Sequence, residues 1–145
     1  MMDDLYQELI IDHGTHPRRL GKLPTCTHQE RGFNPLCGDE LTLYLEVEDH
    51  VVKKVRFEGK GCAISMASAS LMGEKIEGMP VDEVKVLFSQ VHRLLSGENI
   101  TDLGKIEALA GVCKYPMRVK CATLAWHTLV AALNTSGQVS TEEAI

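Results

Sequence analysis

The alternation of apolar and polar residues predicts a β-hairpin in the first half of the chain. From residue 41 to residue 48 every second side chain is apolar, as in a half-buried strand: Leu41, Leu43, Leu45 and Val47. Asp49-His50 follows as a turn, and residues 51–58 form a second apolar-polar run. We therefore expect two antiparallel strands with one face packed on helices.

Helical spacing dominates the rest of the chain. Residues 3–13 form a short amphipathic pattern, and residues 62–77 are apolar on all sides, as in a buried helix. Residues 81–95 match the helical period closely, behind Pro80 and ahead of Ser96-Gly97. The pattern also predicts a short helical segment at 101–112 and a last helix at 116–134.

This order of elements predicts an α+β fold, a small antiparallel β-sheet packed against several α-helices, because strands come first and helices follow. The polar run at 25–33 is expected to add an edge strand. No low-complexity linker divides the chain, so residues 1–134 are expected to form a single domain. Residues 135–145 are expected to be a loose tail.

Composition excludes several classes of function. The chain has 145 residues and a net charge of -5, which argues against a nucleic-acid surface. No apolar run is long enough to cross a membrane. The acidic start, Met1-Met2-Asp3-Asp4, differs from a secretory signal, so we expect a cytoplasmic protein with no membrane partner. Five cysteines at irregular spacings make a disulfide framework improbable in the reducing cytoplasm.

Three cysteines suggest a common site. Cys121 lies roughly 140° from the centre of the apolar stripe of its predicted helix, at about 100° per residue, so core packing does not explain it. Its place in the first turn, beside Arg118 and Lys120, is expected to favour the thiolate. Cys62 follows the glycines of Gly59-Lys60-Gly61 at a predicted strand-to-helix junction, where periodicity does not separate a ligand from a core residue.

Cys37 lies in a predicted turn, Pro35-Leu36-Cys37-Gly38-Asp39, where a buried structural cysteine would be unusual. A Cys-x-Asp pair in a turn presents sulfur and carboxylate to one ion, and zinc accepts both. Three thiolates and one carboxylate would then close a four-ligand site. The spacing leaves a second interpretation open, in which Cys62 is a core residue and Asp39 hydrogen-bonds its own loop.

At these residues the chain resembles the U-type iron–sulfur assembly family, whose fold is SufE/NifU-like, and its SufU branch more than its IscU branch. Lys120 stands where IscU proteins have a histidine, and the Leu-Pro-Pro-Val-Lys chaperone motif is absent. The resemblance spans about residues 3–134 and rests on four segments: Asp12-His13 with Pro17-Arg18 and Gly21, Asn34-Pro35-x-Cys37-Gly38-Asp39, Gly59-x-Gly61-Cys62-Ala63-Ile64-Ser65, and Arg118-Val119-Lys120-Cys121-Ala122-Thr123-Leu124-Ala125-Trp126.

The resemblance implies a zinc ion held by Cys37, Asp39, Cys62 and Cys121. It also implies a partner, a PLP-dependent SufS-type cysteine desulfurase, from which a SufU-like protein accepts persulfide sulfur and relays it to downstream iron–sulfur assembly proteins. Such a protein is a sulfurtransferase-like partner rather than an independent enzyme. Cys37 matches the acceptor of this branch, Cys121 is the second candidate for acceptor, and Arg118 is a candidate auxiliary residue.

Two other functions stay open on the sequence. The same cysteines would suit a scaffold on which a transient iron–sulfur cluster is assembled, or a purely structural zinc module. A zinc deaminase fits poorly, because its His-x-Glu and Pro-Cys-x-x-Cys signatures are absent. We therefore expect sulfur transfer first, with the scaffold as the main alternative.

Overall fold

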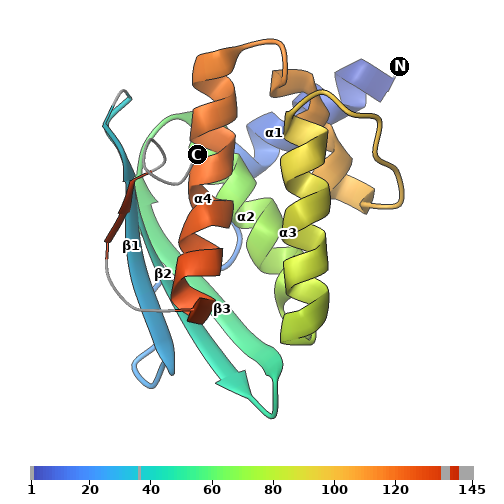
Figure 1. Ribbon diagram of the computed structural model, residues 1–145. Coiled ribbons are helices and arrows are strands. Elements are labelled where there is room, and N and C mark those ends of the chain that lie inside the picture. Colours follow the sequence, from blue (N-terminus) through green and yellow to red (C-terminus); the bar gives the residue numbers. More distant parts are fainter. Residues whose placement is uncertain (1, 36, 135–137, 141–145) are drawn as a thin grey trace.

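The structure is a computed structural model that describes residues 2–35, 37–134 and 138–140. The predicted α+β fold is confirmed, since three of the four strands of one small sheet precede most of the helices (Figure 1). The elements in chain order are α1 (Met2–Thr15), β1 (His28–Asn34), β2 (Asp39–Glu48), β3 (Val51–Lys60), α2 (Ala63–Ile76), α3 (Val81–Leu95), the 3-10 helix η1 (Gly104–Val112), α4 (Pro116–Asn134) and β4 (Gln138–Ser140).

The sheet has the strand order β3-β2-β1-β4. The predicted hairpin is confirmed as β2 and β3, which pair antiparallel around Asp49 and His50. Both of these turn residues have positive φ angles. A register shift at Glu46/Val47 lets Val52 and Val55 both point into the core, although they are three positions apart in the strand.

The expectation that residues 25–33 form an edge strand is wrong, because β1 lies between β2 and β4. Its inward positions are Glu30, Gly32 and Asn34, so an interior strand lacks the usual apolar alternation. A Cβ at Gly32 would collide with the Thr128 side chain, which explains why a glycine stands where α4 crosses the strand.

Part of the expected C-terminal tail joins the sheet. Residues Gln138–Ser140 form β4, which pairs in parallel with residues 31–33 of β1. The remaining residues of that expected tail, 135–137 and 141–145, lie outside the described residues.

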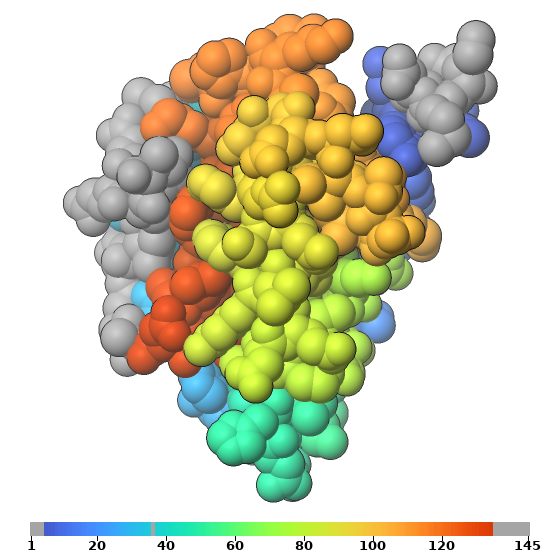
Figure 2. All heavy atoms as spheres, turned by 45° about the vertical axis from the view of Figure 1, so that its right-hand side comes forward, coloured from blue at the N-terminus to red at the C-terminus, as the bar shows by residue number. Residues whose placement is uncertain are grey.

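The helices cover one face of the sheet. Helices α2 and α4 contact the strands, whereas α1, α3 and η1 pack against these two helices (Figure 1). Figure 2 shows α3 as the outer surface of this helical layer, with α4 beside it. The core between the layers includes Leu43, Phe57, Leu71, Trp126 and Leu129. None of the described helices has the length and apolar character needed to cross a bilayer.

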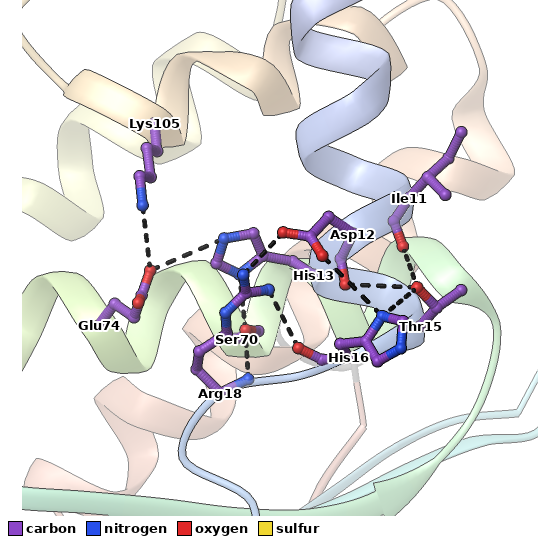
Figure 3. A network of polar contacts seen from close by, with 9 residues as sticks. All are labelled: Ile11, Asp12, His13, Thr15, His16, Arg18, Ser70, Glu74 and Lys105. Atoms are coloured by element: carbon purple, nitrogen blue, oxygen red, sulfur yellow. Dashed lines mark hydrogen bonds and ion pairs between the residues drawn. The ribbon is translucent and has the colours of Figure 1, made fainter.

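A buried polar network ties α1 to α2 (Figure 3). The His13 side chain is 1% exposed, and its Nδ1 lies 2.7 Å from the Ser70 hydroxyl. The same hydroxyl accepts the Arg18 backbone N–H at 2.8 Å. On the other side of the ring, Glu74 lies 3.7 Å from Nε2 and also approaches Lys105. Burial lowers the pKa of His13, so the ring that contacts the Ser70 hydroxyl is held neutral.

Candidate metal centre

Three parts of the fold bring the predicted site residues together. The turn from β1 to β2 carries Cys37, and Asp39 follows as the first residue of β2. Cys62 directly precedes α2, and the second turn of α4 carries Cys121. One donor atom from each of Cys37, Asp39 and Cys121 lies within 4.8 Å of the other two. The Sγ atoms of Cys37 and Cys121 are 3.5 Å apart. Residues far apart in sequence thus form one compact donor cluster.

The β1–β2 turn exposes Cys37 and buries Asp39. The Gly38 N–H bonds the Asn34 carbonyl at 2.8 Å, and Gly38 has a φ of 74°, a value that other residues rarely adopt. Beyond this turn Asp39 begins β2 with its side chain inward and only 1% exposed. The Cys37 thiol remains exposed on the turn itself. One donor is therefore reachable from solvent while its neighbour in the site is fixed.

Cys62 joins the strand-to-helix junction to this cluster. Its backbone N–H donates to Asp39 Oδ1 at 2.9 Å, and its Sγ lies 3.9 Å from Asp39 Oδ2. The thiol also caps α2, because Cys62 Sγ accepts the Ser65 N–H at 3.5 Å. A Cβ at Gly61 would lie 2.5 Å from Asp39 Oδ1, so a glycine is required for this approach. Cys62 therefore borders the Cys37, Asp39 and Cys121 group.

Cys121 contacts Cys37 and Asn34 and lies outside the apolar core cluster, so core packing still does not explain it. Cys121 is nevertheless buried, and the expectation that its surroundings favour the thiolate is wrong. Its side chain is 3% exposed, because α4 is covered on nearly all sides by the sheet, α2 and the β1–β2 turn and has no single apolar stripe. Burial raises the pKa of the Cys121 thiol, and hydrogen bonds with Asp39, Cys37 and Cys62 raise it further. The start of the helix and its basic residues do not overcome this desolvation, so without a cation the thiol stays protonated.

The other site candidates have different surroundings. The Arg118 guanidinium is exposed and stacks on Tyr115, 4.5 Å from the ring centroid. Among the described residues, no hydrogen bond or ion pair connects Arg118 to the cysteines.

Asn34 is a further residue of the site, to which the sequence motif gave no role. Its side chain is fully buried, and its Nδ2 points at Cys121 Sγ, 3.9 Å away. Its place three residues before Cys37 was the only signal in the sequence.

The chemistry and geometry of these donors fit a zinc ion. Two sulfurs bound at about 2.3 Å to a tetrahedral zinc lie about 3.8 Å apart, close to the separation of Cys37 and Cys121. Asp39 is a buried carboxylate, and within the described part of the chain no ion pair offers it a lysine, arginine or histidine. A buried carboxylate needs a compensating cation. The cluster is therefore suited to a divalent metal, with Cys62 positioned beside it.

Comparison with known proteins gives a consistent set of similarities. The family model described as the NifU-like N terminal domain matches residues 5–122. An iron–sulfur cluster assembly scaffold protein IscU of Thermotoga maritima is 47% identical over 131 residues, covering 89% of this chain and 92% of that protein. The zinc-dependent sulfurtransferase SufU of Bacillus subtilis is 40% identical over 131 residues, covering 88% of each chain.

A solved structure has the same fold. The crystal structure of SufU from Fervidobacterium islandicum, described as an iron–sulfur cluster assembly scaffold protein for the SUF system, superimposes with a TM-score of 0.84. That protein is 37% identical in sequence, and the match covers 92% of this chain and 99% of the other.

Proposed function

Because this chain belongs to the NifU-like N-terminal domain family, we propose that it accepts persulfide sulfur from a SufS-type cysteine desulfurase and relays it to iron–sulfur cluster assembly. The proposal is supported by similarity to a protein named a zinc-dependent sulfurtransferase and by the donor cluster. The observation that carries it is that the exposed thiol of Cys37 lies beside two buried metal-type donors, Asp39 and Cys121. The Sγ atom of Cys121 is 3.5 Å from that of Cys37.

Cys37 is the proposed acceptor. Its thiolate attacks the terminal sulfur of the desulfurase persulfide, a new S–S bond forms on Cys37, and the desulfurase cysteine leaves as a thiolate. An acceptor must be reachable by the partner, and Cys37 is exposed on a glycine-flanked turn. Cys121 is the weaker candidate, because its thiol is buried and burial raises its pKa. Cys62 is also exposed, but its Sγ accepts the Ser65 N–H as the cap of α2, so Cys37 on its turn remains the proposed acceptor.

Cys37, Asp39, Cys62 and Cys121 are the residues that would hold zinc. When bound, the ion would keep its cysteine ligands deprotonated, which reverses the preference of an isolated buried thiol. The protein supplies fixed positions for Asp39 and Cys62, which are joined by the bond from the Cys62 N–H to Asp39 Oδ1. We infer that these residues and Cys121 retain the metal when Cys37 reacts.

One experiment tests the transfer. The protein is mixed with a SufS-type desulfurase and cysteine, alanine release is followed, and persulfide sulfur is located by mass spectrometry. We expect the wild type to stimulate turnover and to carry sulfur on Cys37, and Cys37→Ala to do neither. Cys26→Ala is the control, because Cys26 lies outside the cluster. Absence of stimulation by the wild type would refute sulfur transfer, and a persulfide on Cys121 in Cys37→Ala would refute the acceptor assignment.

A cluster-assembly scaffold is the second candidate function. It is favoured by the 47% identity to a protein named an IscU scaffold, and the same thiols would suit a transient iron–sulfur cluster. Metal analysis of protein purified without oxygen separates the two: stoichiometric iron and sulfide support the scaffold, whereas zinc without sulfide supports transfer. A structural zinc module, the third interpretation, would bind zinc and leave desulfurase turnover unchanged.

A further inference from the structure

The Ser68 hydroxyl joins α2 to α4 inside the core. Its Oγ donates to the Ala122 carbonyl at 2.6 Å and accepts the indole N–H of Trp126 at 3.0 Å. Ser68 and Ala122 are 0% exposed and Trp126 is 1% exposed. A single hydroxyl of α2 therefore makes two hydrogen bonds to α4, one as donor and one as acceptor, in a region without access to water.

Both ends of this connection lie near the metal centre. Ala122 directly follows Cys121, so its carbonyl moves with the Cys121 backbone. Ser68 lies on the helix that Cys62 caps, about 9 Å along the axis from that cysteine at about 1.5 Å per residue. The other two donors, Cys37 and Asp39, come from the β1–β2 turn and the start of β2. The hydrogen bonds of Ser68 therefore restrict the movement of α2 relative to α4, and with it the separation between Cys62 and Cys121.

We propose that Ser68 is a positioning residue of the metal centre, which fixes α2 against α4 and so limits how far Cys62 and Cys121 can move relative to one another. The inference rests on the proposed function in one respect, since it takes these four residues as the metal ligands. Ser68 itself touches no donor atom in any described contact. Its effect is transmitted through Ala122 and the α2 backbone.

The physical reason for the effect is preorganisation. A site whose ligands are already at their bound separation pays less ordering free energy when the metal enters. Without the Ser68 hydroxyl, the Ala122 carbonyl and the Trp126 N–H lose their link to α2, and the two helices are held by apolar contacts that tolerate small shifts. Outer-shell partners of metal ligands change affinity by about 10- to 100-fold. Since Ser68 is one step further out, we expect a loss near tenfold.

Ser70 provides a matched control on the same helix. It is also 0% exposed, but its hydroxyl bonds His13 Nδ1 at 2.7 Å and the Arg18 N–H at 2.8 Å, so it connects α2 to α1 (Figure 3). Ser70→Ala and Ser68→Ala each delete one buried hydroxyl and leave one N–H without its partner, that of Arg18 or that of Trp126. They differ in the direction of the lost contact, toward α1 or toward α4.

The test compares Ser68→Ala, Ser70→Ala and Trp126→Phe. Zinc affinity is measured by competition with a chromophoric chelator, the Co²⁺-substituted spectrum reports the ligand field, and thermal unfolding is recorded with and without zinc. We expect Ser68→Ala to weaken zinc about tenfold, alter the Co²⁺ spectrum and reduce the zinc-dependent rise in Tm. Ser70→Ala should lower Tm while keeping wild-type affinity and spectrum. Trp126→Phe should also bind normally, because it keeps the bond from Ser68 to Ala122.

The possible failures are distinguishable. Equal affinity and identical Co²⁺ spectra in Ser68→Ala and the wild type would overturn the positioning role and leave the proposed function standing. Equal weakening in Ser68→Ala and Ser70→Ala would also overturn it, since the effect would then follow stability. A wild-type protein that binds neither zinc nor Co²⁺ would overturn the metal centre and this inference together.

Discussion

The Sγ atoms of Cys37 and Cys121 lie 3.5 Å apart, although one thiol is exposed and the other is buried. The two residues are separated by 84 positions in sequence and come from a turn and a helix. The contact therefore depends on how α4 packs against β1 and β2. It also gives one site two kinds of thiol, one accessible to a partner and one shielded from it.

Zinc removal should reveal this difference in alkylation rates. After chelation we expect iodoacetamide to modify Cys37 quickly and Cys121 slowly, because burial limits access to Cys121 and raises the pKa of its thiol. Peptide mass spectrometry at successive times gives both rates in one sample. Cys26 and Cys113, which are partly exposed, serve as internal references. Equal rates for Cys37 and Cys121 in folded, metal-free protein would contradict the prediction.

Asp39→Asn separates two roles of the carboxylate. The amide oxygen still accepts the Cys62 N–H that Oδ1 accepts at 2.9 Å, but the negative charge and the carboxylate ligand are lost. We expect zinc affinity to fall at least tenfold while the metal-free fold is retained, a loss within the range of about 10- to 100-fold seen even for outer-shell changes. Chelator competition and circular dichroism provide the two measurements. Wild-type affinity would mean that Asp39 only orients the Cys62 backbone.

Gly61→Ala should damage the centre by crowding. The added Cβ would lie 2.5 Å from Asp39 Oδ1, so the carboxylate or the chain before α2 must move. Overpacking of this kind typically costs about 1–3 kcal/mol of folding free energy, and here it should also weaken zinc binding. Gly111→Ala is the control, since an added Cβ there meets no atom within 4 Å. Denaturant unfolding and zinc competition on both variants would show the contrast, and equal behaviour would contradict it.

The sequence predicted the elements with strong periodicity and the members of the donor cluster. The hairpin around Asp49 and the helix at 81–95 follow from local patterns alone, and the structure has both. Cys37, Asp39 and Cys121 were grouped by motif, and their donors do converge. Local patterns sufficed for the hairpin and the helix, whereas the spacing of the cysteines left two interpretations open and the ligand set was implied only by the family resemblance.

Other features depended on tertiary packing and were not predictable from one sequence. The interior place of β1 was missed because Gly32 and Asn34 point inward where apolar residues would normally mark a buried strand. The burial of Cys121 was missed because α4 is enclosed on nearly all sides, so helical phase does not identify an exposed face. The Ser68 contacts join residues 54 and 58 positions apart, and no local pattern indicates them.

His13 should make folding stability depend on pH in the acidic range. Its pKa in the folded protein lies below the ordinary value of 6.5, first because burial disfavours the charged ring and then because Arg18 repels it. Lys105 adds to this repulsion, whereas Glu74 and Asp12 oppose it. Between the folded pKa and about 6.5 the unfolded chain binds the extra proton. The stabilisation from neutral His13 is therefore complete above about pH 6.5 and is lost as the pH falls through the folded pKa.

His13→Asn tests this pH dependence, because an amide can hydrogen-bond the Ser70 hydroxyl as donor or acceptor but does not titrate. We expect the variant to be less stable than the wild type at pH 7.5, and the difference in unfolding free energy to shrink as the pH is lowered below about 6.5. Denaturant unfolding of both proteins at matched pH cancels the contributions of His127 and of the cysteine site, which the two share. A stability difference that stays constant or grows toward low pH would show that His13 is not held neutral by burial.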